Sequence, residues 1–227
     1  MRLSWIKPKR SSARGKASAE TLSPGEGYRR WAQSYGVQPN AFQQLEAPLL
    51  AKLLPDVKGR RVLDLGCGKG RVSQLAQQRG AARVVASDLS LSMLIDERGY
   101  PGPKLVCDAG QSLPFGRHSF DLVVCALVLG HIEHLGGALS AIGESLRPGG
   151  HLIISDFHPF ATLRGWQRTF EDPVSGQTRA IEQHLHLFSE YIGELGRRDL
   201  TLEAMEEATW EDFPVLFVMR THKRAIG

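Results

Sequence analysis

From residue 60 onward, short apolar runs alternate with stretches of helical periodicity, and this alternation limits the possible folds more than any other feature of the chain. It predicts βαβ units, because two parallel strands need a long crossover connection that is usually a helix. The expected strands are Arg61–Leu65, Arg83–Ser87, Lys104–Cys107, Phe120–Leu127 and His151–Asp156. The expected helices lie near Gly70–Gln78, Leu91–Glu97 and Leu135–Leu146. The pattern therefore predicts an α/β fold built around a parallel sheet.

The segments on either side of this region are shorter or less regular. Tyr28–Tyr35 has amphipathic spacing, and Ala41–Leu54 has helical spacing up to Pro55. The proline and paired glycines of Arg147–Gly150 predict a tight turn. The last third of the chain is expected to close with a helix and a hairpin, at Ser189–Arg197, Leu200–Met205 and Pro214–Thr221.

A chain of 227 residues fits a single α/β domain. We expect a flexible basic arm over residues 1–25 and one domain over residues 26–227. The expected divisions of the domain are N-terminal helices over 26–59, a ligand-binding core over 60–156, an insertion or lid over 157–187, and a closing helix and hairpin over 188–227.

The formal charge of +4 comes from the first 19 residues, which hold six basic and no acidic side chains. The rest of the chain has 22 basic against 24 acidic residues, so a basic face for nucleic acid is disfavoured. The Arg- and Ser-rich start is similar to a transit peptide, but Pro8 breaks the helix that such a signal needs. No apolar run reaches the ~18 residues of a membrane span. We expect a cytoplasmic protein, and no obligate protein partner is indicated.

The three cysteines, Cys67, Cys107 and Cys125, form no CxxC pair and fall at strands or strand ends. This pattern favours core thiols over a disulfide framework or a structural zinc site. His184 and His186 lack a third ligand nearby in the sequence. We therefore predict no metal site.

Residues 62–70, Val-Leu-Asp-Leu-Gly-Cys-Gly-Lys-Gly, form an apolar strand that leads through three alternate glycines into a helix. Glycines let the chain turn sharply and let backbone N–H groups approach a ligand. A dinucleotide-binding fingerprint would have its third glycine at position 71, where this chain has Arg71. Asp64 would also repel a pyrophosphate, whereas it suits a cationic amino group.

Two further acidic residues follow later strands. Asp88 comes 20 residues after Gly68, which is about the spacing at which an acidic side chain reaches ribose hydroxyls in Rossmann-type sites. Asp108 follows the third strand. Taken singly, Asp88 also suits a helix N-cap and Asp108 an ordinary loop carboxylate.

From about residue 60 to 156, the chain resembles the motif pattern of class I S-adenosylmethionine-dependent methyltransferases. The segments that carry this resemblance are Asp64–Gly70, Cys107-Asp108-Ala109, Leu113–Phe115, Ser119–Val123 and Leu146–Gly150. The similarity is greatest to the group with ubiquinone, menaquinone and malonyl carrier-protein methyltransferases (methyltransferase domain 11). Tyr28-x-x-Trp31-x-x-x-Tyr35 resembles the N-terminal segment of that group.

The resemblance implies a Rossmann-like, seven-stranded, mostly parallel sheet with helices on both faces and a C-terminal antiparallel strand. It implies S-adenosylmethionine as the cofactor. The cofactor-binding residues that it implies are Asp64, Gly66, Cys67, Gly68, Gly70, Asp88, Leu89, Asp108, Ala109, Leu127 and Tyr35.

The implied reaction is an in-line methyl transfer to a small-molecule or carrier-bound acceptor, on oxygen or carbon, with positioning as the main catalytic factor. His131 and His158 follow the fourth and fifth strands and are the candidate catalytic residues. Phe160, Trp166 and Phe170 are candidates for the acceptor pocket, although they equally suit a lid with its own core. The alternatives are an RNA methyltransferase that uses the basic arm and a non-catalytic module that binds the cofactor. An NAD-dependent oxidoreductase is disfavoured by Asp64 and Arg71.

Overall fold

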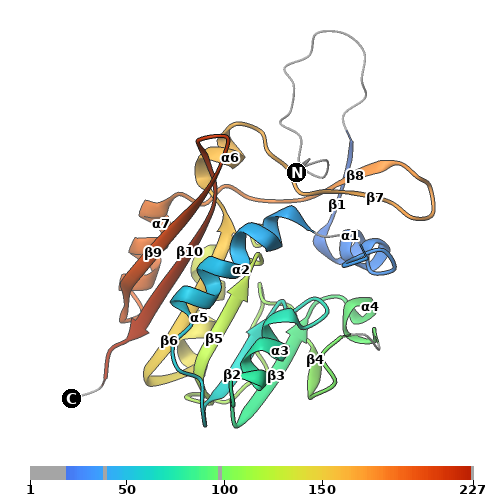
Figure 1. Cartoon of the computed structure of the whole chain (residues 1–227). Helices are drawn as coiled ribbons and strands as arrows, with labels where there is room; N and C mark the ends of the chain where they lie inside the picture. The colour runs from blue at the N-terminus through green and yellow to red at the C-terminus, as the bar shows by residue number, and fades with distance from the viewer. Residues whose placement is uncertain (1–18, 38–39, 97–98, 226–227) are drawn as a thin grey trace.

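The chain folds around a seven-stranded sheet in the computed structural model, which describes residues 19–37, 40–96 and 99–225. The strand order is β4 (Lys104–Val106), β3 (Arg83–Asp88), β2 (Arg61–Leu65), β5 (Phe120–Ala126), β6 (Leu146–Phe157), β10 (Phe213–Lys223) and β9 (Leu200–Trp210) (Figure 1). The first five strands are mutually parallel, and β10 is antiparallel to both of its neighbours. The predicted Rossmann-like sheet is therefore confirmed.

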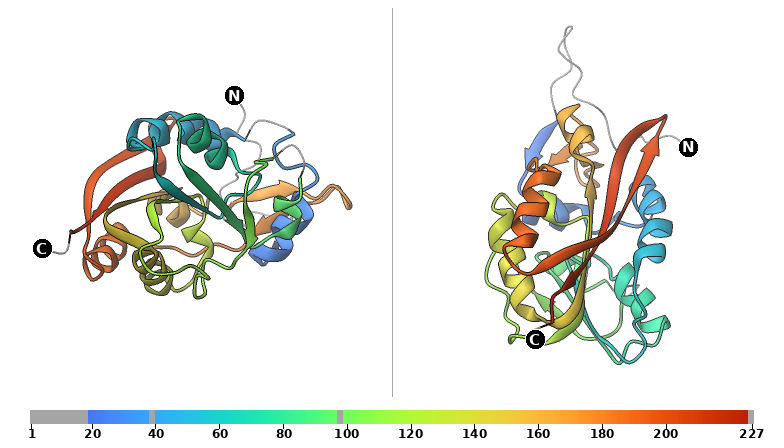
Figure 2. Two further views of the ribbon diagram at one scale, coloured as in Figure 1. Left: turned by 90° about the horizontal axis from the view of Figure 1, so that it is seen from below. Right: turned by 90° about the vertical axis from the view of Figure 1, so that its left-hand side faces the viewer.

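Helices cover both faces of this sheet (Figure 2). On one face, α2 (Ala41–Leu53) and α3 (Arg71–Gln78) join the strands in a shared apolar cluster. On the other face, α5 (Leu135–Ser145) and α7 (Phe188–Gly196) belong to a second cluster. Because both faces are covered, the central strands are buried along most of their length instead of on alternate residues, as in β5, whose first six residues are all buried.

A small second sheet is formed by β1 (Glu20–Leu22), β8 (Thr178–Ile181) and β7 (Thr169–Glu171), next to α1 (Pro24–Trp31). Strand β1 runs parallel to β8, so a segment near the start of the chain pairs with one about 160 residues later. The prediction of a flexible arm up to residue 25 is therefore wrong for residues 20–25. The six basic residues of the expected arm lie outside the described residues.

Three local boundaries differ from the prediction. Helix α4 (Leu91–Leu94) is one turn long. Strand β5 ends at Ala126 because Leu127 has a left-handed φ of 64°. The turn predicted at Arg147–Gly150 lies within β6, where a register irregularity between Phe120 and Leu122 of β5 accommodates it. The remaining short elements are η1 (Leu129–His131) and α6 (Pro159–Leu163).

Within the described residues, no helix is long and apolar enough to cross a membrane, and His, Cys, Asp and Glu side chains form no group of three that could hold a metal ion. Cys107 and Cys125 are buried free thiols, and Cys67 is a partly buried one. Burial raises the pKa of the Cys125 thiol.

Gly70 provides a test of how tightly the turn between β2 and α3 is packed. Its φ is 82°, and a Cβ at this position would lie 2.3 Å from Cβ of Tyr100. Gly70→Ala should lower the free energy of unfolding by about 2–4 kcal/mol, because it adds steric overlap to left-handed backbone strain. Urea denaturation measures this loss.

Gly59 is the matched control, since its φ is 70° and no described atom lies within 4 Å of the added Cβ. Gly59→Ala should cost only the backbone strain, about 1–2 kcal/mol. Equal losses for the two variants would show that Tyr100 yields to the new methyl group at no cost.

Candidate functional site

A cavity of about 510 Å³ lies where β2, β3 and β5 end. Its wall combines the loops that follow these strands with α1, the turn after α1 and the start of α2. Every predicted site residue except Gly70 and His158 lines it, namely Asp64, Gly66, Cys67, Gly68, Asp88, Leu89, Asp108, Ala109, Leu127, Tyr35 and His131. Residues chosen on separate motifs therefore share one cavity.

The glycine loop after β2 owes its shape to close contacts. Gly66 has a φ of 71°, and a Cβ there would come within 2.2 Å of Val128. Gly68 has a φ of 55° and donates its backbone N–H to Asp88 Oδ2 over 2.8 Å. Gly70 precedes the first residue of α3 and packs against Tyr100 outside the cavity wall, so its predicted contact with a cofactor is not supported.

Asp64 is fully buried at the end of β2. Its Oδ2 accepts hydrogen bonds from the backbone N–H and the hydroxyl of Ser73, at 2.8 and 2.6 Å. Its Oδ1 is also buried and has no hydrogen-bond partner among the described residues. Burial raises the pKa of this carboxyl group to about 6, against the opposing effect of the Ser73 hydrogen bonds.

Asp88 and Asp108 organise the next two loops. Asp88 Oδ1 accepts the N–H of Ser90 at 2.8 Å, so this carboxylate braces both its own loop and the glycine loop. Burial raises the pKa of Asp88, and its two backbone hydrogen bonds act in the opposite direction. Asp108 is exposed, and its Oδ1 accepts the N–H of Gly110 at 2.8 Å. Both carboxylates keep spare lone pairs for a ligand.

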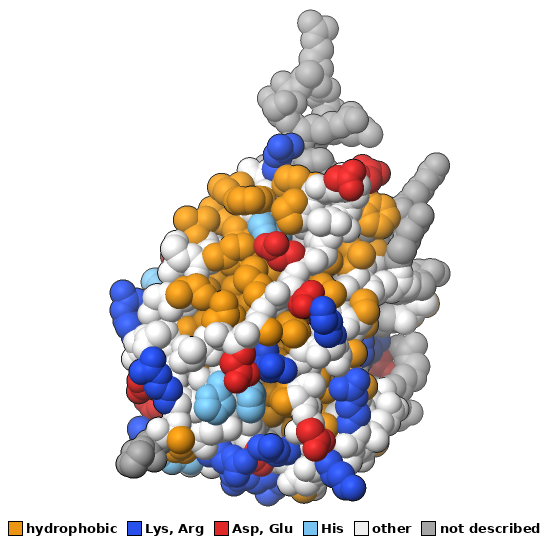
Figure 3. Space-filling view, turned by 60° about the vertical axis from the view of Figure 1, so that its left-hand side comes forward, with side chains coloured by type: hydrophobic (Ala, Val, Ile, Leu, Met, Phe, Trp, Pro, Cys, Tyr) orange, Lys and Arg blue, Asp and Glu red, His pale blue; other side chains and the backbone are white. Residues whose placement is uncertain are grey.

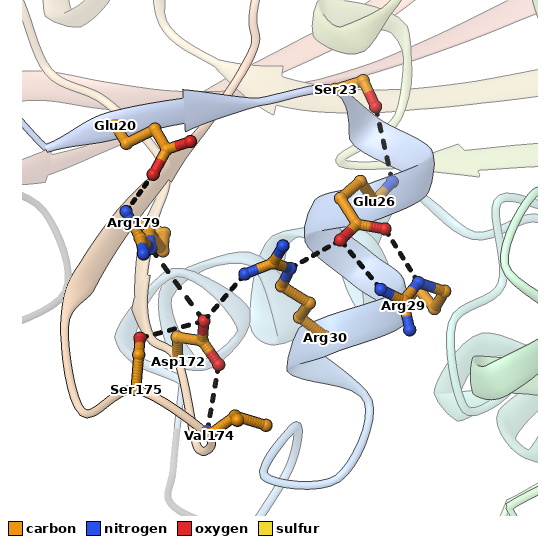
Figure 4. Close-up of polar contacts among 9 residues, drawn as sticks. All are labelled: Glu20, Ser23, Glu26, Arg29, Arg30, Asp172, Val174, Ser175 and Arg179. Carbon is orange, nitrogen blue, oxygen red and sulfur yellow. Dashed lines mark hydrogen bonds and ion pairs between the residues drawn. The ribbon is translucent and has the colours of Figure 1, made fainter.

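The cavity is roofed by α1 and the β7–β8 hairpin, which are joined by buried Asp172 (Figure 4). Asp172 lies 3.2 Å from Nη1 of Arg30 on α1 and 3.9 Å from Nε of Arg179 on β8. Arg179 also pairs with Glu20 on β1. These contacts attach β1 and α1 to a hairpin that lies far along the chain from them.

Tyr35 follows α1 and lies over the glycine loop. Its ring comes within 3.7 Å of the position that a Cβ of Gly68 would occupy, and its hydroxyl accepts a hydrogen bond from Gln43 at 2.8 Å. Its carbonyl accepts a bond from Lys69 at 2.6 Å. Tyr35, which the resemblance implies as a cofactor-binding residue, therefore lies on the cavity wall.

A polar cluster forms another part of the wall. Nη1 of Arg168, just before β7, has three acceptors within hydrogen-bond distance, which are the Tyr28 hydroxyl at 2.6 Å, the Leu127 carbonyl at 2.8 Å and Nε2 of His131. The Tyr28 hydroxyl also lies 3.0 Å from Nε2 of His131. Burial, and then the Arg168 cation, hold the pKa of His131 well below its usual value.

His158 lies away from the cavity. Its Nδ1 accepts the N–H of Phe160 and caps α6, and its Nε2 bonds to Glu207 at 2.8 Å. A catalytic role for His158 is therefore not supported. Its sequence position at the end of a strand was correct, but the backbone turns directly into α6 and directs the imidazole into the fold.

The aromatic residues predicted for the acceptor pocket do not line the cavity either. Phe170 stacks on Trp31, Trp166 packs near Phe42, and Phe160 is largely exposed. The aromatic part of the wall comes instead from Tyr28, Trp31, Tyr35, Phe42 and Phe157.

Three polar residues of this region were missed at the level of sequence. Arg71 lines the cavity and pairs with buried Glu46 of α2, which also accepts the Ser155 hydroxyl. Arg168 lies in a stretch without periodicity, so no local pattern singled it out. Tyr28 did carry a signal, because its spacing to Trp31 places the two on one face of a helix.

Comparison with known proteins supports the resemblance to S-adenosylmethionine-dependent methyltransferases that the sequence motifs indicate. Residues 63–154 match the family model described as "Methyltransferase domain". A malonyl-[acyl-carrier protein] O-methyltransferase of Enterobacter lignolyticus is 34% identical over 73% of this chain and 67% of its own length. A demethylmenaquinone methyltransferase of Paenarthrobacter aurescens is 34% identical over 56% of this chain, which spans about half the length of that relative.

The crystal structure of an S-adenosylmethionine-dependent methyltransferase from Mesorhizobium loti superposes with a TM-score of 0.65, at 25% identity, over 78% of this chain and 97% of the other. The fold and the relatives thus define the class of Rossmann-like S-adenosylmethionine-dependent methyltransferases. Within that class, the chain belongs to the methyltransferase domain family that its residues 63–154 match.

The raised pKa of Asp64 predicts how stability changes with pH. The folded state holds the proton up to a pKa of about 6, whereas the unfolded chain releases it near the ordinary aspartate pKa of 3.8. This contribution to stability is therefore complete below pH 3.8 and is lost as pH rises through 6, by roughly 2–3 kcal/mol.

Asp64→Asn removes this titration and keeps one oxygen to accept the Ser73 bonds. The stability of the variant relative to the original protein should therefore rise between pH 4 and pH 7, as measured by urea denaturation at both values. A relative stability that is flat across this range would mean that Asp64 ionises near its ordinary pKa.

Proposed function

We propose that this protein transfers a methyl group from S-adenosylmethionine to a small-molecule or carrier-bound acceptor. The observation that carries the proposal is that Asp64, Asp88 and Asp108, which end three different strands or follow them, line one cavity beside the glycine loop. A dinucleotide site is a poorer match, because buried Asp64 lines the cavity together with the glycine loop and an ionised carboxylate there would repel a pyrophosphate.

The residues present fit S-adenosylmethionine. Asp64 offers a buried acceptor atom, Oδ1, that lacks a partner among the described side chains and suits an ammonium group. Asp88 has lone pairs left for ribose hydroxyls. Asp108 and the backbone of Ala109 suit the amino group and a ring nitrogen of adenine.

S-adenosylmethionine, when bound, supplies an electrophilic methyl group on a positively charged sulfur. The chain itself aligns the two reactants and keeps water away. These two effects account for much of the lowering of the activation barrier in displacements of this kind. Tyr35, Trp31 and Phe157 give the cavity aromatic walls suited to that task. His131 is neutral and hydrogen-bonded on both ring nitrogens, so it suits positioning more than proton transfer.

Two relatives bear on the acceptor. One is named for a malonyl carrier-protein ester and the other for demethylmenaquinone, so their names cover carrier-bound and small-molecule acceptors. The first of these names also gives oxygen as the atom that takes the methyl group. The class of acceptor proposed for this chain spans the same range.

Binding of S-adenosylhomocysteine, the reaction product, tests the cofactor assignment. Asp88→Ala should weaken this binding by about 1–3 kcal/mol, the scale of a lost hydrogen bond to a charged group. Isothermal titration calorimetry gives the affinity, and NAD should not bind in the same assay.

Asp56→Ala is the matched control, because Asp56 is an exposed carboxylate that accepts the N–H two residues ahead, as Asp88 does. The control should leave the affinity unchanged. Unaltered affinity in Asp88→Ala would remove Asp88 from the site. Transfer of label from S-adenosylmethionine to a metabolite extract then separates an enzyme from a module that only binds.

The pH dependence of binding tests the role of Asp64. An ammonium group pairs with the ionised carboxylate, whose pKa in the free protein is raised to about 6. Affinity for S-adenosylhomocysteine should therefore fall as pH drops below 6, by up to about tenfold per pH unit. 5′-Methylthioadenosine, which lacks the ammonium group, should bind without this dependence. A parallel fall for both ligands would count against the ammonium contact.

A further inference from the structure

Among the described residues, the basic side chains that line the cavity are Lys69, Arg71 and Arg168, and they differ in how many of their N–H donors are already used. Nζ of Lys69 lies 2.6 Å from the Tyr35 carbonyl oxygen and 2.5 Å from Oδ2 of Asp96. Nη1 of Arg168 is shared among three acceptors of the wall. Lys69 and Arg168 are therefore largely occupied within the protein.

Arg71 is held by a single contact and keeps unused donors. Its Nη2 pairs with the carboxylate of Glu46, which is fully buried in α2 and also accepts the Ser155 hydroxyl. In the described part of the chain, this is the one ion pair of Arg71, and none of its nitrogens is buried without a partner. The side chain is 36% exposed. Because a guanidinium carries five N–H donors in a rigid fork, Arg71 is fixed on one side and can donate on the other.

Arg71 lies next to the glycine loop. It is the first residue of α3, directly after Gly70, and the N-terminus of a helix favours a negative charge. Gln74, one turn further along α3, also lines the cavity. Burial raises the pKa of Asp64 and of Tyr35, and the Arg71 cation acts in the opposite direction on each. Arg71 is therefore close enough to both groups for its charge to act on them.

The chemistry of the cofactor determines which anion this cation would meet. In an amino acid, one carbon atom separates the ammonium group from the carboxylate, so a protein binds the two groups side by side. The proposed function assigns the ammonium group to Oδ1 of Asp64, which is buried and lacks a partner among the described residues. A cation beside Asp64 with unused N–H donors matches the neighbouring carboxylate.

Resting on the proposed function, we infer that Arg71 binds the carboxylate at the amino acid end of S-adenosylmethionine, and that Glu46 is the residue that positions Arg71. The site then recognises the two opposite charges of the cofactor with two opposite charges of its own, on Asp64 and Arg71. Arg71 is thereby a specificity-determining residue. It disfavours ligands that keep the adenosine and the ammonium group but lack the carboxylate.

The test compares two ligands on the full chain. S-adenosylhomocysteine carries both the ammonium group and the carboxylate, whereas S-adenosyl-3-thiopropylamine keeps the ammonium group and lacks the carboxylate. Isothermal titration calorimetry gives both affinities. S-adenosylhomocysteine should bind about tenfold or more tightly than the amine. Arg71→Gln should lower this ratio about tenfold and leave the affinity for S-adenosyl-3-thiopropylamine within about threefold.

Arg79→Gln is the matched control. Arg79 follows the last residue of the same helix, is exposed and does not line the cavity. This variant should leave the ratio unchanged. An equal fall in the control would show that the ratio depends on the overall positive charge near α3 and not on a contact with Arg71.

Arg71→Gln leaves the buried carboxylate of Glu46 without its ion pair, which lowers stability. The double variant Glu46→Gln/Arg71→Gln removes both charges together and should show the same loss of the ratio. Glu46→Gln alone keeps Arg71 but weakens its anchor, and it should lower the ratio about threefold. A general loss of structure would weaken both ligands alike, so the ratio separates recognition from stability.

The outcomes separate the inference from the proposed function. If the unaltered protein binds the two ligands equally, or if the ratio survives in both variants that lack Arg71, the assignment of Arg71 is overturned while the cofactor assignment stands. If S-adenosylhomocysteine itself does not bind to the unaltered protein, the proposed function fails first.

Discussion

The parallel pairing of β2 with β3 on one side and β5 on the other is the constraint on which the site depends. Leu65 at the end of β2 is paired with Ser87 of β3 and Cys125 of β5. Since the three strands run in the same direction and nearly in register, the chain leaves the sheet at one edge three times. The loops that follow β2, β3 and β5 are therefore brought together at this edge, as is usual for ligand sites of open α/β sheets.

This edge of the sheet combines a glycine loop of left-handed backbone conformation with a buried carboxyl group. Gly66 and Gly68 have left-handed φ angles, and Gly66 has no room for a Cβ against Val128. Beside them, Asp64 is buried with one oxygen bonded to Ser73 and the other without a partner among the described residues. A buried carboxylate that is half satisfied lowers the stability of the fold. Its retention at a cavity wall is the arrangement expected of a binding group, and the apolar clusters on both sheet faces offset the cost.

A second constraint acts from outside the sheet. Asp172 ties α1 to the β7–β8 hairpin through Arg30 and Arg179, and this contact sets the positions of Tyr28 and Arg168 over the cavity. The polar part of the cavity wall therefore depends on tertiary contacts between segments far apart in the chain.

The outer surface near α6 and α7 is rich in exposed apolar side chains, among them Phe160, Leu163, Leu187 and Ile192 (Figure 3).

The sequence by itself determined the mostly parallel sheet and most of the residues that line the cavity where β2, β3 and β5 end. It did so because apolar periodicity, glycine spacing and acids after strand ends are local signals, and parallel pairing turns them into neighbours in a predictable way. The tertiary structure alone decided the other side of the cavity. Strand β1 pairs with β8, Arg168 reaches His131, and His158 caps α6 instead of entering the site. These outcomes depend on contacts between residues tens to more than a hundred positions apart and on side-chain directions, and neither leaves a periodic trace in the chain.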